Sequence, residues 1–344
     1  MRKVHGWAVL TVAVALGGAA CGGGGGKSGD TAAGGGYTAT TVATKALGDP
    51  AIKAVGVVAR TDAARQPLDA APSPDGTVVY YVATGDGGAA GAGAGVFKVA
   101  AGGAVSTLAE GAPLVKPTGV AVATDGSRLY VADRETPATD GGGAGGGILT
   151  LATDGTPGAP TLLAGTQGRS PRGLDVVRQA DGDVVYFTGT DPANGSPGLF
   201  MVPAAGGTVV TVAEGGPLAS PDSVVVAGDG VAYVTDQGAG VGQGTVLHLA
   251  GGTATTVLTG LHLGSPAGIT LAGGDSTLLV SSLDATTLSD QVLFVELATG
   301  TTAVASKVIG SNINSSGGLH RAHDASMLAW CDVSRSGRVY RVDI

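Results

Sequence analysis

Six regularly placed aspartates are the first candidates for chemistry in this 344-residue chain. Each follows a short apolar stretch, and the set is Asp86, Asp133, Asp191, Asp236, Asp284 and Asp332. If these carboxylates gather on one face, they form an acidic rim whose negative potential would attract a cation or a basic partner. An aspartate in this position can also cap its own turn by accepting hydrogen bonds from nearby backbone N–H groups. We favour the capping interpretation, because repeated segments reuse turn residues for structural reasons.

A second set of polar side chains lies close to a recurring proline. Thr118, Arg172 and Asp222 each follow directly after a proline that opens an apolar stretch, and His320 lies on the matching stretch near the C-terminus. We expect these four side chains at the mouth of a channel, in contact with a ligand. His320 and His323 are three residues apart on an expected strand, so they point to opposite faces and do not share a metal ion. No catalytic residue is assigned, because the sequence has no G-x-S-x-G motif and no recognisable Ser, His and Asp set.

The elements that position these residues follow from one recurring stretch, Pro117–Asp133, with the sequence PTGVAVATDGSRLYVAD. It contains a proline, an apolar strand, an Asp-Gly turn and a second strand. Variants of it open at Pro67, Pro117, Pro171, Pro221, Pro266 and Ser316, which are 50, 54, 50, 45 and 50 residues apart. A repeat of this length with four short apolar stretches is typical of a propeller blade. The sequence therefore predicts an all-β fold, a six-bladed β-propeller of four-stranded antiparallel blades.

The last repeat is too short for four strands, and the other end of the chain supplies the missing one. Residues 316–344 have room for only three strands, whereas Val55–Arg60 resembles, in length and pattern, the fourth strand that precedes Pro221. We therefore expect the N-terminal strand to join the C-terminal blade and close the ring, which leaves few exposed edges. The expected blades are residues 67–116, 117–170, 171–220, 221–265, 266–315, and 316–344 together with 52–66.

The N-terminal residues predict export. Residues 1–20 combine Arg2 and Lys3 with a short apolar run and small residues, which is the pattern of a lipoprotein-type signal peptide. Cys21 would then carry the lipid, and residues 21–36 form a glycine-rich tether ahead of a propeller domain over residues 37–344. Cleavage by an ordinary signal peptidase remains an alternative, because lipoprotein signals usually have a large aliphatic residue three positions before the lipidated cysteine, where this chain has Gly18. The predicted location is the bacterial cell envelope, on its periplasmic or cell-surface side.

Charge and composition exclude nucleic acid as a partner. The chain has 19 basic and 27 acidic residues, for a net charge of −8, so it lacks the basic footprint of a nucleic-acid-binding protein. Aromatic residues make up only 4% of the chain, too few for a row of stacking platforms.

Three loops are rich in glycine, and they are Gly85–Gly95, Gly141–Gly147 and Gly238–Gly244. They are expected either to form a mobile rim over a ligand or to reflect the composition of the chain alone.

The pattern P-x-G-apolar, D-G and L-Y-V-A-D in Pro117–Asp133 resembles that of NHL-repeat and gluconolactonase-like six-bladed propellers. The resemblance covers roughly residues 52–344 and implies, for the gluconolactonase branch, a divalent cation held by a Glu, an Asn and an Asp. Asp222 stands at the matching Asp position. Arg172 stands where the Asn would be, and Leu68 stands at the Glu position, with Asp69 one step beyond. One ligand in three is therefore retained.

These observations predict a membrane-tethered, extracytoplasmic propeller that acts as a ligand-binding or scaffold module of the cell envelope. It would be a monomer without a cofactor, held to the membrane through a lipid on Cys21, with an envelope protein or a small molecule as its ligand. One alternative is a lactonase-type hydrolase that uses a divalent cation at Asp222, helped by Asp175 or Asp69. A further alternative is a purely structural envelope protein, because propellers serve many unrelated functions.

Overall fold

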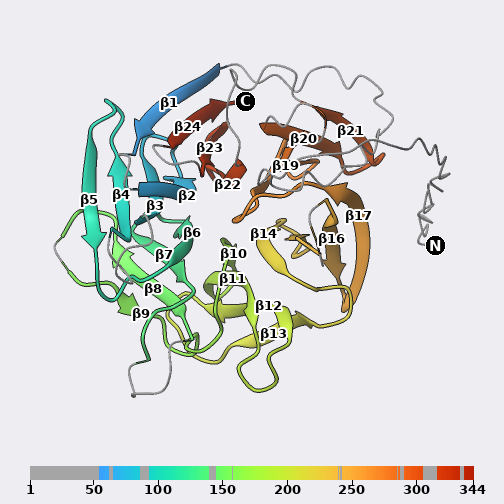
Figure 1. The fold of residues 1–344 in the computed structure, drawn as a ribbon, viewed down its shortest axis with the longest axis horizontal. Helices are drawn as coiled ribbons and strands as arrows, with labels where there is room; N and C mark the ends of the chain where they lie inside the picture. Colours follow the sequence, from blue (N-terminus) through green and yellow to red (C-terminus); the bar gives the residue numbers. More distant parts are fainter. Residues whose placement is uncertain are drawn as a thin grey trace, which may run out of the picture. The chain divides into compact units, whose positions relative to one another are not determined.

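A computed structural model describes residues 54–61, 65–85, 93–138, 145–156, 158–238, 240, 242–284, 286, 290–304, 316–333 and 337–344. These residues form 24 β-strands, and none of them is helical. Accordingly, the described residues contain no helix long and apolar enough to cross a membrane. The strands form six four-stranded antiparallel sheets, arranged as the blades of a six-bladed β-propeller (Figure 1). The predicted fold class is confirmed.

Each blade is a meander in which neighbouring strands in the chain pair with each other. Blade 1 contains β2 (Arg65–Pro72), β3 (Val79–Gly85), β4 (Gly95–Val99) and β5 (Val105–Glu110). Blade 2 contains β6 (Pro117–Val122), β7 (Arg128–Asp133), β8 (Gly147–Ala152) and β9 (Thr161–Leu162). Blade 3 contains β10 (Leu174–Gln179), β11 (Gly182–Thr190), β12 (Pro197–Pro203) and β13 (Val210–Glu214). Blade 4 contains β14 (Pro221–Val226), β15 (Ala232–Asp236), β16 (Gly244–Ala250) and β17 (Thr253–Leu261). Blade 5 contains β18 (Ile269–Ala272), β19 (Thr277–Leu283), β20 (Asp290–Glu296) and β21 (Thr301–Val304).

Blade 6 closes the ring. It consists of β22 (Ser316–Arg321), β23 (Met327–Asp332) and β24 (Arg338–Asp343), completed by β1 (Ala54–Arg60) from the other end of the described chain. β1 runs antiparallel to β24 with Ala54 opposite Asp343 and Arg60 opposite Arg338. The two strands lie side by side in Figure 1. The predicted closure by the N-terminal strand is therefore confirmed.

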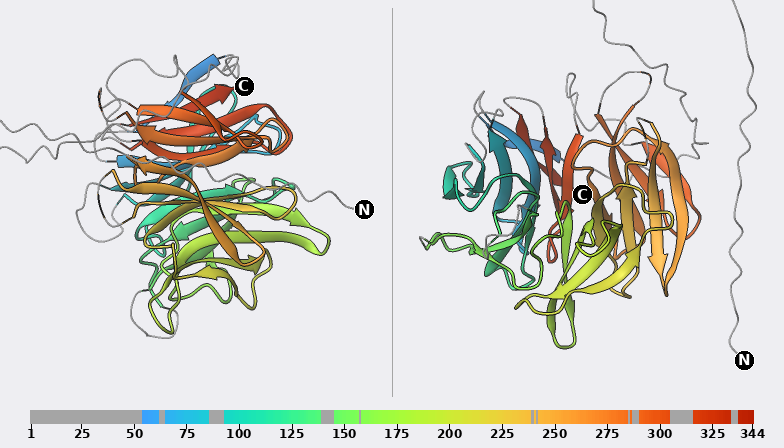
Figure 2. Two further views of the ribbon diagram at one scale, coloured as in Figure 1. Left: turned by 90° about the vertical axis from the view of Figure 1, so that its right-hand side faces the viewer. Right: turned by 60° about the horizontal axis from the view of Figure 1, so that its bottom comes forward.

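The strands run between two faces of the ring, and the connections gather on those faces (Figure 2). On one face, the loop after the second strand of a blade meets the segment that leads into the first strand. Arg134 N donates to Lys116 O at 3.1 Å, and Gln237 N donates to Ser220 O at 3.0 Å. We call this the mouth face. It presents segments that the sequence singled out, because Pro117 and Asp133 of blade 2 and Pro221 and Asp236 of blade 4 adjoin these bonds.

Apolar side chains fill the space between neighbouring blades. One cluster combines Ala121 and Tyr130 of blade 2 with Val185, Phe187 and Phe200 of blade 3, all of them buried. Burial of such residues at roughly 25 cal/mol per Å² of apolar surface is the main force that holds blades together. Five tyrosines of the second strands are likewise buried, and they are Tyr80, Tyr81, Tyr130, Tyr186 and Tyr233.

Glycine in the P-x-G pattern has a steric reason. A Cβ atom added to Gly173, the residue after Arg172, would lie 2.6 Å from the carbonyl oxygen of Asp222 in blade 4. An equivalent atom on Gly119 would meet the carbonyl oxygen of Arg172 in blade 3. Neighbouring inner strands thus approach each other so closely at the mouth face that a side chain does not fit between them. The same contact fixes the backbone on which Arg172 is carried.

Candidate functional site

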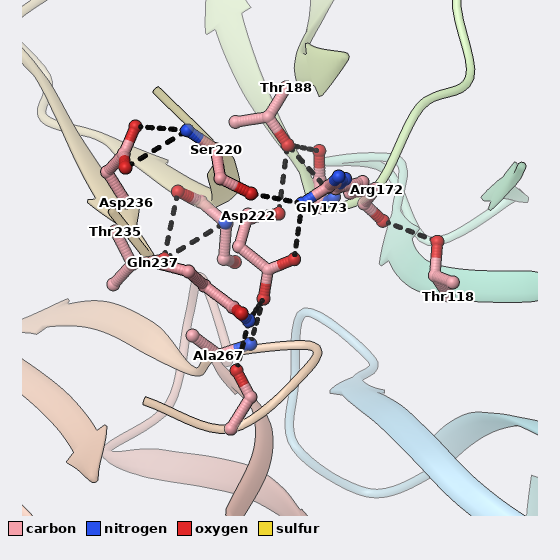
Figure 3. Close-up of polar contacts among 12 residues, drawn as sticks. Thr118, Arg172, Gly173, Thr188, Ser220, Asp222, Thr235, Asp236, Gln237 and Ala267 are labelled. Atoms are coloured by element: carbon pink, nitrogen blue, oxygen red, sulfur yellow. Dashed lines mark hydrogen bonds and ion pairs between the residues drawn. The ribbon is translucent and has the colours of Figure 1, made fainter. Parts of the chain in front are cut away.

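The centre of the candidate site is an ion pair between Arg172, just before β10, and Asp222, the second residue of β14 (Figure 3). The guanidinium Nη1 of Arg172 lies 3.7 Å from Asp222 Oδ1 and donates a hydrogen bond of 2.9 Å to Ser220 Oγ. The Arg172 side chain is 26% exposed, whereas that of Asp222 is 2% exposed. The arginine therefore reaches solvent at the mouth face, and the carboxylate holds it from beneath.

Asp222 is anchored to the next blade as well as to Arg172. Its Oδ2 accepts hydrogen bonds from Ala267 N at 2.5 Å and from Gln237 Nε2 at 3.2 Å. The Gln237 amide also donates to Gly264 O at 2.7 Å, which fixes its orientation. Burial raises the pKa of Asp222, while these donors and the charge of Arg172 act in the opposite direction. The carboxylate thus joins blade 4 to blade 5 and orients the guanidinium.

A second guanidinium, that of Arg134, follows β7 at the same face. Burial and the positive charge of Arg172 lower the pKa of Arg134, and the charge of Asp222 partly offsets this effect. Its Nε atom is buried and has no hydrogen-bond partner among the described residues. The charge of Glu135 acts on Arg134 in the same direction as that of Asp222. The guanidinium donors that the mouth face carries at blades 2 to 4 suit an anionic or electron-rich ligand.

The other two residues expected at the mouth are buried and bonded within the protein. Thr118 is 7% exposed, and its Oγ1 donates to the carbonyl oxygens of Arg172 at 3.0 Å and of Pro171 at 3.3 Å. It therefore holds the backbone that carries Arg172. His320 is also 7% exposed, and its Nε2 lies 2.9 Å from Asp69 Oδ2 of blade 1. His320 thus contacts the neighbouring blade.

Asp69 and His320 form what we call the closure seam, between the first and last blades. Asp69 is 2% exposed and accepts further hydrogen bonds from Ala70 N at 2.9 Å and from Val120 N of blade 2 at 2.8 Å. Burial lowers the pKa of His320, but the charge of Asp69, the hydrogen bond to it and the charge of Asp175 outweigh burial, so that the pKa is raised. One carboxylate thereby links three blades.

Hydroxyl groups on the second strands are a feature that the sequence analysis missed. Thr188 Oγ1 accepts a hydrogen bond from Gly173 N at 3.2 Å and donates to Asp222 O at 2.9 Å. Ser281 plays the same part in blade 5, where it accepts from Gly268 N at 2.9 Å. The signal was present, because a hydroxyl residue precedes the strand-ending aspartate by one or a few positions in several repeats. Its role becomes clear only once the pairing of strands is known.

Where the structure gives their hydrogen bonds, the carboxylates of the expected acidic rim accept them from backbone amides, either of their own loop or of the segment that leads into the first strand of the same blade. Asp133 and Asp236 are buried at 0% and 2% exposure. Asp133 accepts hydrogen bonds from Val115 N, Lys116 N and Glu135 N, and Asp236 accepts them from Ala219 N, Ser220 N and Gly238 N. Asp191 accepts a hydrogen bond from Ala193 N, and Asp284 accepts one from Thr286 N. Asp332 is buried, at 4% exposure.

Several expectations fall outside the described residues. They concern the rim residue Asp86, the lipidation candidate Cys21 and the whole of residues 1–53. They also concern parts of the glycine-rich loops, namely residues 86–92, 139–144, 239 and 241.

The residues around Asp222 do not fit a divalent cation. Its nearest partners are N–H donors and a guanidinium, which are the opposite of the oxygen or nitrogen lone pairs that a cation needs. Leu68, at the position of the implied Glu ligand, is 8% exposed and part of an apolar cluster. Among the described residues, no group of three or more His, Cys, Asp or Glu side chains is arranged to hold a metal ion.

No protein-family model and no curated protein matches the sequence. Solved structures, however, share its fold. A glucose dehydrogenase superposes with a TM-score of 0.60 at 11% identity, over 85% of this chain and 99% of that one. A gluconolactonase from Xanthomonas campestris superposes with a TM-score of 0.57 at 16% identity, over 84% and 88% of the two chains. A protein of unknown function from Dyadobacter fermentans gives a TM-score of 0.59 at 13% identity, over 86% and 99%.

At these identities the similarity concerns the fold alone, because six-bladed propellers carry unrelated activities on one architecture. The chain is thus a six-bladed β-propeller with structural neighbours that include two enzymes. The expected NHL-repeat character and the lipid anchor stay predictions. Its function must be argued from its own side chains.

Proposed function

We propose that this protein is a ligand-binding propeller of the bacterial cell envelope, tethered to a membrane through a lipid on Cys21 and active as a monomer. The ligand is a small molecule or a segment of an envelope protein that contacts the mouth face at blades 2 to 4. The observation that carries the proposal is the Arg172–Asp222 pair, in which a buried carboxylate orients a guanidinium that is 26% exposed.

The free donors of the Arg172 guanidinium support ligand binding in preference to a purely structural role. Among the described residues the Arg172 side chain makes one hydrogen bond, to Ser220 Oγ, and its ion pair with Asp222 spans 3.7 Å, so much of its donor capacity remains available. An arginine with a planar fork of five donors is well suited to carboxylate, phosphate or carbonyl groups. A scaffold without a ligand would have no need to keep such a group half-open at a channel mouth.

A thermal-shift screen of the full-length protein tests the proposal. The probes are carboxylic acids, phosphate esters, neutral sugars and amines, each at millimolar concentration. A compound that binds only the native state stabilises it by RT ln(1 + L/Kd), where L is the ligand concentration, so the melting temperature rises with the logarithm of that concentration once it exceeds Kd. We expect at least one class to stabilise the wild type and to lose this effect in Arg172→Met. The matched control is Arg178→Met, because Arg178 is 67% exposed and lies near the other end of β10. No stabilisation by any class, or equal stabilisation of Arg172→Met, would refute the proposal.

A second candidate is a lactonase-type hydrolase. Two observations favour it, namely the fold shared with a gluconolactonase and the raised pKa of Asp222, which suits a general acid. The donors that surround Asp222 oppose the cation that the resemblance implies. Elemental analysis of the full-length protein, dialysed against trace Ca²⁺, Zn²⁺ and Mn²⁺, separates the two candidates. One metal ion per chain that is lost in Asp222→Asn, together with hydrolysis of a sugar lactone, would establish the hydrolase.

A further inference from the structure

Unsatisfied polar atoms are concentrated in one part of the mouth face. Six buried side-chain nitrogen or oxygen atoms of the described residues have no hydrogen-bond partner, and five of them belong to four residues in two loops. We call these four residues the blade 2–3 rim, and they are Arg134, Thr136, Gln167 and Arg169. Their unsatisfied atoms are Arg134 Nε, Thr136 Oγ1, Gln167 Oε1 and Arg169 Nε and Nη1.

The two loops meet through Gly145 and Gly146. Gly146 O accepts hydrogen bonds from Gly168 N at 2.9 Å and from Gln167 Nε2 at 3.4 Å, and Gly145 O accepts one from Ser170 N at 2.7 Å. On its other side, Gly146 packs so closely on the backbone of Arg134 that a Cβ atom there would meet the Arg134 carbonyl group. The two loops that carry the rim residues are therefore in direct contact.

Arg169 is the rim residue whose unsatisfied atoms should destabilise the fold most, because two of its guanidinium nitrogens lack partners. Its side chain is 14% exposed, its guanidinium carbon lies 4.7 Å from the centre of the Phe200 ring, and Nη1 lies 3.9 Å from Asp191 Oδ2. That distance allows ionic attraction but is too long for a hydrogen bond. A buried donor without an acceptor destabilises the folded state, and more so when the group is charged. Native structures retain few such atoms, so five of them in two contacting loops call for an explanation.

Other arginines in the same protein show the contrast. Arg341 donates to Asp343 Oδ1 at 2.9 Å and to Gly76 O at 2.6 Å, and Arg178 donates to Asp183 Oδ1 at 3.1 Å. The fold thus provides acceptors for guanidinium groups away from the rim. The rim also contains Thr136, which is 3% exposed and still has an unpartnered hydroxyl.

We propose that the blade 2–3 rim is an oxyanion-binding site, in which Arg134 and Arg169 donate to a carboxylate or phosphate group of a small ligand. Thr136 Oγ1 adds a neutral donor, and Gln167 Oε1 accepts a hydrogen bond from a hydroxyl group beside the anion. The inference rests on the proposed function and names the chemical class of its ligand. A charge-assisted hydrogen bond between a guanidinium and an oxyanion is among the strongest available to a protein.

Isothermal titration calorimetry of the full-length protein with sodium acetate and with sodium phosphate tests this site, with sodium chloride at equal ionic strength as the control for screening. We expect saturable binding of at least one oxyanion, and the arm that responds tells whether carboxylate or phosphate is the recognised group. Arg134→Met and Arg169→Met should each weaken binding at least tenfold. Arg169→Lys, which keeps the charge, should weaken it less. Arg178→Met should leave it unchanged.

Two results would overturn the inference, namely no saturable heat with either oxyanion and binding that persists unchanged in both methionine variants. Circular dichroism of each variant, compared with the wild type, shows whether the propeller is folded when binding is lost. The outcomes remain distinct from those of the proposed function. Oxyanion binding without any effect of Arg172→Met in the thermal-shift screen refutes only the Arg172 site. A neutral ligand whose binding needs Arg172 refutes only the proposed oxyanion site at the blade 2–3 rim.

Discussion

The closure seam and the mouth of the channel use the same pair of groups in different ways. In both places an aspartate on an inner strand is almost fully buried and accepts a hydrogen bond from a backbone amide of the next blade, Val120 N for Asp69 and Ala267 N for Asp222. In both places the aspartate also faces a basic side chain. At the seam, His320 is 7% exposed and lies 2.9 Å from its carboxylate. At the mouth, Arg172 is 26% exposed and lies 3.7 Å from its carboxylate.

The difference shows how one structural device serves two purposes. A basic side chain enclosed against its carboxylate joins two blades, because removal of either partner leaves a buried polar or charged group without its partner. A cation that is offset from its carboxylate and open to solvent retains donors for a ligand. The mouth has, in addition, a second guanidinium in Arg134 with an unpartnered Nε atom. Stability is therefore expected to depend on the seam, and binding on the mouth.

The largest effect is expected from removal of the seam carboxylate. Asp69→Ala leaves Val120 N without its acceptor and His320 without its partner, and both are buried. Breaking a buried pair of this kind costs about 3–5 kcal/mol. Urea denaturation measures the loss, with Asp181→Ala, an exposed aspartate in the β10–β11 turn, as the control. A loss below about 1 kcal/mol would mean that the seam does not hold the ring together.

A smaller loss is expected when the close approach of two inner strands is disturbed. Gly173→Ala introduces a Cβ atom 2.6 Å from Asp222 O, so blades 3 and 4 must separate. Overpacking of this kind costs about 1–3 kcal/mol. It should also displace Arg172 and weaken ligand binding. Gly56→Ala is the matched control, since its Cβ atom meets nothing within 4 Å. Equal stability of the two variants in urea would contradict the steric account of the P-x-G pattern.

Titration of His320 should make the seam sensitive to pH. Its folded-state pKa is raised above the ordinary histidine value of 6.5. The stabilisation from protonated His320 is therefore complete below pH about 6.5 and is lost as the pH rises through the folded-state pKa. Urea denaturation at several pH values should show stability falling over this window in the wild type and not in His320→Gln. The exposed His323→Gln variant should keep the wild-type profile.

Repeat spacing was sufficient to predict the architecture. The six opening positions set the number of blades, and the short last repeat showed which strand completes the ring, because strand pairing in a propeller is local in sequence. The first strands of blades 2, 4 and 6 begin at opening positions, namely β6 at Pro117, β14 at Pro221 and β22 at Ser316, whereas β2 begins at Arg65 and β18 at Ile269. β10 begins at Leu174, although Arg172 N still pairs with Thr188 O at 3.0 Å, so the prediction for that blade is close.

The candidate site was harder to predict, because burial depends on which residues of different blades meet. The repeat pattern predicts three further side chains at the mouth of the channel, those of Thr118, Asp222 and His320. Each of them instead bonds to a neighbouring blade. Arg134 was missed, because it follows a strand-ending aspartate in only one repeat and has no counterpart that would attract notice. The pairing of Asp69 with His320 joins residues 251 positions apart, a contact that no local pattern predicts.

The free energy of unfolding of Arg134→Met tests the contrast between seam and mouth most directly. Methionine keeps the apolar stem and removes a charge that has an unpartnered Nε atom and a like-charged neighbour in Arg172. We predict a stability in urea equal to that of the wild type or higher by up to about 1 kcal/mol, because an unsatisfied buried donor is removed. A loss of about 3 kcal/mol, comparable to that expected for Asp69→Ala, would show that Arg134 is a structural group and would contradict the assignment of the mouth to binding.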